Sequence, residues 1–311
     1  MEKIRINNKG IENLLKRVFP RMELKKTEKF SKGLTSGLVL KIKINNPNIT
    51  LVLKLSKLKR KSETDKNNKI LRYLNKNEIP SPKIFYSGIY NKKIATVMEY
   101  AEGDIAGEIY AHGNQKLRKN ILKNAGKILR RIHNLNAPPF WIHQHHEIKN
   151  ASEWKRWTEN RVKKYLIFSE ENLSEFYETL KKELEDFWRV LDRTKIKLVP
   201  LHWDYHLYNL NVDYHGEITG VFDFDNSMKG HNLADLGQTA YWIRFQLKDK
   251  KNIENFLTGY KKNFSKEELK MIQGYLILHL LAVSRTIWRK QKRLKWILKE
   301  HKKILKEMLK K

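Results

Sequence analysis

Apolar and polar positions alternate along much of the first third of the chain, which predicts strands paired into a sheet. Two of these segments are separated by Asn-Asn-Pro-Asn at residues 45–48, which predicts the tight turn of a hairpin. Apolar residues at helical spacing instead predict a short helix over residues 3–18 and a longer one over residues 62–77. The expected strands cover residues 37–44, 49–57, 83–90 and 92–100.

Beyond residue 100 the periodicity becomes mainly helical, with one strand-rich stretch over residues 196–225. A strand-rich first third followed by a helical remainder predicts an α+β chain in two lobes. We expect a small antiparallel-sheet N-lobe with one main helix over residues 1–99, and a larger, mainly helical C-lobe over residues 100–311. The expected helices of the C-lobe cover residues 115–135, 151–168, 171–192, 234–248, 252–261 and 266–310.

The charge balance is strongly basic, because 64 Lys and Arg residues against 34 Asp and Glu residues give a net charge of +30. Clustered cations bind nucleic acid or anionic membranes, but lysines scattered along a whole chain more often only solvate its surface. Residues 289–311 stand out because they combine apolar residues at helical spacing with many basic ones. We expect an amphipathic helix that docks by its apolar stripe, and binding of a phosphate-bearing partner is the alternative.

Composition also excludes several classes of chemistry. The chain contains no cysteine, which rules out disulfides, thiolate nucleophiles and cysteine-ligated zinc. No apolar run approaches the length of a transmembrane helix, and the N-terminus lacks the apolar core of a secretory signal. We therefore expect a cytoplasmic protein, and we make no prediction of its oligomeric state.

The most informative segment is V-P-L-H-W-D-Y-H-L-Y-N-L-N-V over residues 199–212, which contains the spacing H-x-D-x-H-x-x-N. A strand-like G-V-F-D-F-D-N follows it and carries Asp223. Phosphoryl transfer needs a carboxylate that accepts a hydroxyl proton, and oxygen ligands that hold Mg²⁺ against the triphosphate. Asp204 and Asn209 on one tight loop, together with Asp223, supply these groups. Ordinary turn capping by Asp and Asn is the alternative interpretation.

This segment resembles the catalytic loop H-G-D-x-H-x-x-N of the aminoglycoside phosphotransferase and choline kinase family, a branch of the protein-kinase-like superfamily. The following V-F-D-F-D-N is similar to the metal-binding segment of that family. The resemblance implies a two-lobed protein-kinase-like fold in which Asp204 is the catalytic base and Asn209 and Asp223 bind Mg²⁺. It also implies that His202 and His206 brace the loop.

Further matches extend the resemblance into the N-lobe. Lys54, in V-L-K-L-S-K, resembles the strand lysine that contacts the α and β phosphates of the nucleotide. An exposed strand lysine is the alternative interpretation. The turn K-G-L-T-S-G resembles the loop that covers the phosphates, with Gly33, Ser36 and Gly37 as the expected contacts, although two glycines alone are a weak signal.

The resemblance also covers the junction of the lobes and the helical half of the chain. A-T-V-M-E-Y-A-E-G-D resembles the hinge, where backbone groups of Glu99, Tyr100 and Ala101 would bind the purine. Asp235, in N-L-A-D-L-G, resembles the aspartate that ties the helical lobe to the catalytic loop. Residues 140–200 are expected to form the insert that determines acceptor specificity.

The chain departs from the family pattern at several positions. The glutamate expected to pair with Lys54 falls near Asn67, so Glu63, one helical turn earlier, is the expected substitute. Trp203 replaces the small residue of the catalytic loop, and Asp225 replaces the glycine of D-F-G. Trp203 removes no group that phosphoryl transfer requires, and the absence of the D-F-G glycine fits small-molecule kinases better than protein kinases. The non-acidic Asn67 is the best sequence support for a catalytically silent protein.

These features predict a Mg²⁺-dependent phosphotransferase that moves the γ-phosphate of ATP or GTP to a hydroxyl of a small-molecule acceptor. The acceptor stays open. A +30 protein repels polycationic aminoglycosides at long range, and its eight tryptophans could either form an aromatic box for a quaternary amine or simply pack. The alternative function is a catalytically silent kinase-fold protein that binds nucleic acid or an anionic partner through its basic surface.

Overall fold

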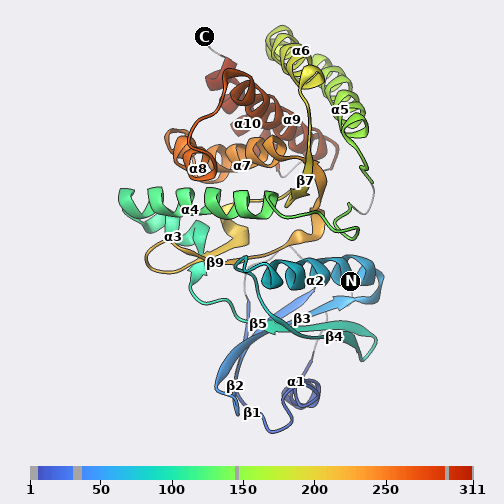
Figure 1. Cartoon of the computed structure of the whole chain (residues 1–311), viewed down its shortest axis with the longest axis vertical. Helices are drawn as coiled ribbons and strands as arrows, with labels where there is room; N and C mark the ends of the chain where they lie inside the picture. Colours follow the sequence, from blue (N-terminus) through green and yellow to red (C-terminus); the bar gives the residue numbers. More distant parts are fainter. Residues whose placement is uncertain (1–5, 31–36, 144–146, 291–293, 310–311) are drawn as a thin grey trace.

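The computed structural model describes residues 6–30, 37–143, 147–290 and 294–309. Figure 1 shows a sheet-containing lobe and, beyond it, a larger helical lobe, joined through the segment after strand β5. This arrangement confirms the expected α+β, two-lobed, kinase-like fold. Strand β5 ends at Glu99, and the boundary between residues 99 and 100 stays a prediction.

The N-lobe sheet has five antiparallel strands in the order β1-β2-β3-β5-β4. Four of them match the expected strands closely. The fifth, β1, was not predicted, because its sequence E-L-K-K-T-E-K is charged on both faces and lies at the edge of the sheet. The strands are β1 (Glu23–Lys29), β2 (Leu38–Asn45), β3 (Ile49–Lys57), β4 (Ile84–Tyr90) and β5 (Lys93–Glu99).

Helices cover both faces of this sheet (Figure 1). Helix α1 (Asn8–Leu15) buries apolar residues on one face, where Leu53 and Leu55 of β3 belong to the same apolar core. Side chains alternate along a strand, so Lys54 faces the other side, together with helix α2 (Lys61–Lys76). Asn68 of α2 anchors the helix there by donating to the Thr96 hydroxyl of β5 at 3.1 Å.

The C-lobe is built from helices that pack around one apolar core. The expected helix over residues 266–310 is in fact two helices, α9 and α10, and the short α3 was not predicted. Helices α4 and α8 approach closely at Gly126, where a Cβ atom would lie 2.2 Å from the Phe256 carbonyl oxygen. The helices are α3 (Ala106–His112), α4 (Gln115–His133), α5 (Ala151–Asn172), α6 (Tyr177–Arg193), α7 (Asn232–Gln246), α8 (Ile253–Tyr260), α9 (Lys266–Lys290) and α10 (Lys295–Leu309).

Short strands carry the segments that the sequence singled out. Strand β7 (Leu198–Leu201) pairs with β10 (Met228–His231), and β8 (Leu210–Val212) pairs with both β6 (Asp104–Ile105) and β9 (Ile218–Val221). The loop between β7 and β8 is the H-x-D-x-H-x-x-N segment, and Asp223 follows β9. Pairing of β8 with β9 therefore brings the end of that loop beside the second acidic segment.

The basic C-terminal helix α10 docks by its apolar stripe, as expected. Ile304 and Leu305 are buried against the core, and helices α7 and α9 are its neighbours. His301 is also buried, and its ring nitrogens contact the Tyr241 and Ser284 hydroxyls at 2.8 and 2.7 Å. In the part of the chain that the structure describes, no helix is long and apolar enough to cross a membrane.

Candidate active site

The loop between β7 and β8 is held from beneath by one buried carboxylate. Asp235, in the first turn of α7, accepts hydrogen bonds from the backbone N–H groups of His202 (2.8 Å) and Trp203 (3.0 Å). Its Oδ2 also lies 3.1 Å from Nε2 of His133 on α4. Because a buried carboxylate needs such partners, these contacts support the bracing role expected for Asp235.

The two loop histidines lie in surroundings that disfavour their charged forms. His202 is fully buried and donates from Nε2 to the Phe222 carbonyl at 2.8 Å; burial lowers its pKa. His206 accepts from the Tyr208 N–H at Nδ1, so its proton is on Nε2, 3.6 Å from Oδ1 of Asp204. Burial, with a smaller contribution from His202, lowers the pKa of His206 to about 3. Neither ring is therefore charged at neutral pH.

The three residues expected to carry out the chemistry converge at one place. The Asn209 side chain donates to the Asp204 carbonyl at 2.9 Å, which closes the loop between them. The Phe222 N–H donates to the Asn209 carbonyl at 3.0 Å, so Asp223 lies beside the same loop. Asp223 adopts a left-handed backbone conformation with φ of 61°. Such strain is typical of residues that a functional site holds in a fixed direction.

Burial and neighbouring carboxylates raise the pKa values of Asp204 and Asp223. Burial raises the pKa of Asp204 to about 7, and the charge of Asp223 adds to the rise, while a hydrogen bond from Asn226 opposes it. Burial and the nearby Asp225 also raise the pKa of Asp223, and the charge of Lys54 opposes that rise. The site is therefore short of positive charge on its own, which favours a cationic ligand.

The donor set fits Mg²⁺ bound together with phosphates better than a cage made by protein alone. Over the described ranges, no group of three or more His, Cys, Asp or Glu side chains is arranged to hold a metal ion. Magnesium usually takes one or two carboxylates and completes its shell with water and substrate phosphates. Asp223 offers a carboxylate of this kind, and Asn209 offers an amide oxygen.

The N-lobe contributes Lys54, but not through the pair expected for it. Lys54 is close enough to Asp223 for its charge to lower the pKa of that carboxyl. Glu63 instead forms an ion pair with Arg60 at 2.5 Å, and no described residue forms one with Lys54. The expected Lys54–Glu63 pair is therefore wrong, because Arg60 reaches Glu63 across a single helical turn.

Asn67, at the position where the family places its glutamate, takes a different part. Its Oδ1 accepts from the Phe224 N–H at 3.1 Å, in the segment that follows Asp223. Arg60 reaches the same segment and contacts Oδ2 of Asp225 at 2.6 Å, while Lys66 donates to the Asp225 carbonyl at 2.7 Å. The sequence does not single out Arg60 and Lys66 as site residues, because both stand in the charged run K-L-K-R-K-S-E-T-D-K.

At the hinge, where backbone groups of Glu99 to Ala101 are expected to bind the purine, two of the three N–H groups donate to protein carbonyls. The Glu99 N–H donates to the Lys83 carbonyl at 2.9 Å, and the Tyr100 N–H donates to the Thr50 carbonyl at 3.2 Å. The Ala101 N–H has no acceptor among the described residues. A cavity of about 790 Å³ opens here and is lined by all three hinge residues, but not by the carboxylates of the catalytic loop.

Of the expected phosphate-covering turn, Gly33 and Ser36 lie outside the described residues. Gly37 lies inside them, and a Cβ atom there would be 2.7 Å from the Leu55 carbonyl oxygen. Glycine is thus required at residue 37 by the close approach of strand β3.

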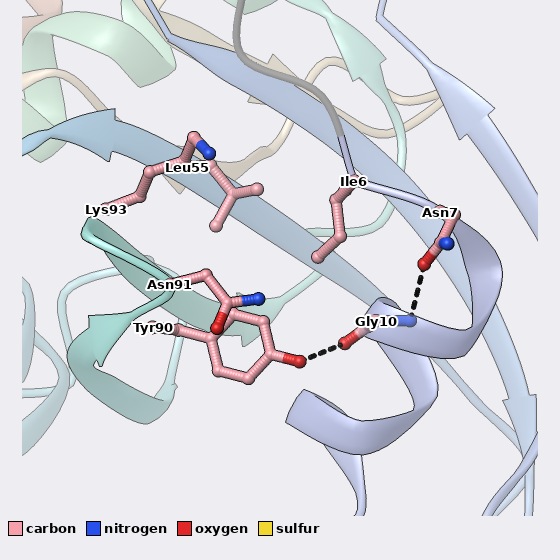
Figure 2. Close-up of a pocket in the computed structure, with 7 residues that line it drawn as sticks. All are labelled: Ile6, Asn7, Gly10, Leu55, Tyr90, Asn91 and Lys93. Atoms are coloured by element: carbon pink, nitrogen blue, oxygen red, sulfur yellow. Dashed lines mark hydrogen bonds between the residues drawn. The ribbon is translucent and has the colours of Figure 1, made fainter.

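A second cavity, of about 500 Å³, lies between α1 and the sheet (Figure 2). Figure 2 shows Tyr90 donating its hydroxyl to the Gly10 carbonyl at its rim, while Leu55 lines the same cavity. Leu55 faces away from the side of the sheet that Lys54 faces. This cavity is therefore separate from the carboxylate cluster.

Fold and site together define a protein-kinase-like phosphotransferase architecture. Residues 28–271 match the family model described as the phosphotransferase enzyme family, and the chain belongs to that family. Its fold is similar to a thermostable mutant of aminoglycoside phosphotransferase APH(4)-Ia in complex with ADP and hygromycin B. That structure has a TM-score of 0.67 and 12% identity, over 96% of this chain and 98% of that one. The GDP and kanamycin complex of APH(2″)-IIia is also similar in fold. It has a TM-score of 0.64 and 13% identity, over 96% of this chain and 97% of that one.

One curated protein also matches part of the chain. It is the protein N-terminal glutamine amidohydrolase of Caenorhabditis briggsae, with 29% identity over 132 residues. The match spans 38% of this chain and 64% of that protein, so this chain covers just under two thirds of the relative. The amidohydrolase activity belongs to that protein.

Proposed function

We propose that this protein transfers the γ-phosphate of ATP or GTP to a hydroxyl of a small molecule in a Mg²⁺-dependent reaction. The observation that carries the proposal is the convergence of Asp204, Asn209 and Asp223 beside a buried, braced loop. The charge of Lys54 next to Asp223 supports it, as does membership of the phosphotransferase enzyme family.

In this proposal Asp204 accepts the proton of the acceptor hydroxyl. The hydroxyl oxygen forms a bond to the γ phosphorus, and the bond from that phosphorus to the bridging oxygen of the leaving diphosphate breaks. A pKa of about 7 suits a group that must take up and release a proton near neutral pH. His206, with its proton on Nε2, faces Asp204 and orients the carboxylate.

The remaining residues position the nucleotide. Asp223 and Asn209 hold Mg²⁺, which when bound supplies positive charge to the phosphate oxygens. Lys54 contacts the α and β phosphates, and the turn with Gly37 covers them. The Ala101 N–H donates to the purine, because its two neighbours donate to protein carbonyls instead.

The test separates turnover from nucleotide binding. We would measure transfer of labelled γ-phosphate from Mg²⁺–ATP and Mg²⁺–GTP to a metabolite library, and measure nucleotide affinity separately by thermal shift. Asp204→Asn is expected to lower turnover by about 10³-fold or more while nucleotide affinity changes less than about threefold. Asp192→Asn, an exposed acid on α6, is the matched control and should change neither.

Retained turnover in Asp204→Asn would overturn the assignment of the base. A wild-type protein that transfers phosphate to nothing, and binds tRNA with a steep dependence on salt, would favour the catalytically silent alternative.

A further inference from the structure

The wall of the catalytic loop opposite the nucleotide residues is aromatic and carries one guanidinium. Helix α5 presents Trp154, Trp157 and Arg161 at a spacing of three and four residues, so they share one face. The guanidinium carbon of Arg161 lies 4.6 Å from the ring centroid of Trp157 and 5.5 Å from that of Trp203. Trp203 precedes Asp204 directly, so this group borders the proposed base.

Arg161 has no anionic partner within the described ranges. It forms neither an ion pair nor a hydrogen bond there, and its contacts are the faces of aromatic rings. The acids around the catalytic loop have other partners: Asp235 accepts from the loop backbone, and Asp225 pairs with Arg60. A half-buried guanidinium without a counter-ion is an unsatisfied binding group for an anion.

Two further N–H donors, close to the His206 ring, are also unsatisfied within the described ranges. The Trp242 ring lies 5.1 Å from the ring of His206, which faces Asp204, and 5.6 Å from the ring of His279. Nε1 of Trp242 and Nε2 of His279 are buried, and neither has a hydrogen-bond partner among the described residues. His279 accepts from the Gln238 amide at Nδ1, so its proton is on Nε2. Both orphan atoms are therefore donors.

Trp203 itself is held in an unusual conformation in this wall. Its φ is 61°, in the left-handed region that bulky residues rarely adopt. Asp235 accepts from its N–H and Gln238 donates to its carbonyl, so α7 fixes the peptide on both sides. The fold thus tolerates backbone strain at the residue whose ring lies next to Arg161 and which directly precedes Asp204.

We propose that the acceptor is an anionic hydroxy compound, whose carboxylate or phosphate group binds Arg161 together with the N–H donors of Trp242 and His279. This inference rests on the proposed function, because it assigns the acceptor class of the same site. The partly exposed rings of Trp157 and Trp203 pack against the apolar part of the acceptor, and its hydroxyl points to Asp204. A polycationic acceptor is excluded, since it would meet a guanidinium where it needs a carboxylate.

The test is a binding titration without nucleotide, in which tryptophan fluorescence reports binding. It is run at about 150 mM salt, because salt screens non-specific attraction to the basic surface. The probes are four related six-carbon polyhydroxy compounds: glucose, glucose 6-phosphate, gluconate and glucosamine. We expect glucose 6-phosphate or gluconate to change the fluorescence saturably and to bind at least about tenfold more tightly than glucose or glucosamine. Whichever anion binds more tightly identifies phosphate or carboxylate as the group recognised.

Two variants connect the binding to Arg161. Arg161→Gln is expected to weaken the preferred anion at least about tenfold, whereas Arg156→Gln, an exposed arginine on the same helix, should change it less than about twofold. Trp242→Phe keeps the ring and removes the N–H, and it should weaken the anion about threefold or more.

The wild-type titration can overturn the inference whatever the stability of the variants: the inference fails if glucose or glucosamine binds as tightly as the anions, or if none of the four compounds binds. It also fails if Arg161→Gln and Arg156→Gln weaken binding equally. Binding of Mg²⁺–nucleotide and γ-phosphate transfer are measured in separate assays, so failure of the anion assignment and failure of the proposed function give different results.

Discussion

The two sides of the catalytic loop differ in how their charges are paired. On the proposed nucleotide side, each cation has an oxygen partner or an acidic neighbour: Arg60 pairs with the Asp225 carboxylate, Lys66 donates to the Asp225 carbonyl, and Lys54 lies near Asp223. On the acceptor side, Arg161 has aromatic rings for neighbours and no carboxylate among the described residues. The comparison teaches that net charge says little about binding, because pairing decides which charges stay available to a ligand.

The largest effect should come from the nucleotide side. Asp223→Asn removes the carboxylate proposed to bind Mg²⁺ and should weaken Mg²⁺-dependent nucleotide binding by about 100-fold or more. Arg161→Gln, on the acceptor side, should leave nucleotide affinity within about twofold. Calorimetric titration of ATP with and without Mg²⁺ measures both. Equal losses in the two variants would mean that the two sides are not distinct.

Loss of the buried Asp235 carboxylate, which holds the loop between β7 and β8, should have the largest effect on stability. Asp235 is fully buried and accepts from His202 and Trp203, so Asp235→Asn leaves at least one backbone donor poorly matched. We expect the free energy of unfolding to fall by about 3 kcal/mol, measured by urea denaturation. Asp192→Asn should change it by less than about 0.5 kcal/mol. A similarly small loss for Asp235→Asn would contradict the bracing role.

Removing the ion pair between Arg60 and Asp225 should have a moderate effect on catalytic efficiency. Arg60→Gln removes the partner of Asp225, whose charge raises the pKa of Asp223. The metal carboxylate then sits among more negative charge, while the link between α2 and the metal segment is lost. We expect kcat/KM for the nucleotide to fall about tenfold, whereas the exposed neighbour Lys59→Gln should have little effect. An unchanged kcat/KM in the Arg60→Gln variant would show that the ion pair between Arg60 and Asp225 is dispensable.

The smallest effect is a dependence of stability on pH in metal-free protein. Because the folded state raises the pKa of Asp204 from 3.8 to about 7, folding penalises its ionised form. This penalty is absent below about pH 4, grows as the pH rises to about 7 and is constant above that. Asp204→Asn should therefore stabilise the protein by about 1–2 kcal/mol at pH 8, after solvent screening of this partly exposed carboxyl, and by almost nothing at pH 4. Thermal denaturation in EDTA at both pH values checks this. A pH-independent difference would contradict it.

Local pattern predicted most of the fold. Strands β2 to β5, helix α2 and most C-lobe helices follow directly from alternation or helical spacing. Strand β1 was not predicted, because it is charged on both faces. Its pairing with β2, and not an alternating pattern in its own sequence, makes it a strand. The separate α9 and α10 escaped because one apolar period runs through both.

For the site, the chain by itself determined which groups are present: the carboxylates, the amide and the loop spacing that resembles a phosphotransferase. These follow from residue type and short-range spacing, which folding leaves unchanged. Only the tertiary structure decided the partners. It paired Glu63 with Arg60, placed Asn67 against the segment that follows Asp223, and left Arg161 beside tryptophan rings with no ion pair in the part of the chain that the structure describes. Ion pairs and hydrogen bonds depend on distances of a few ångströms between residues far apart in sequence, and those distances exist only once the chain has folded.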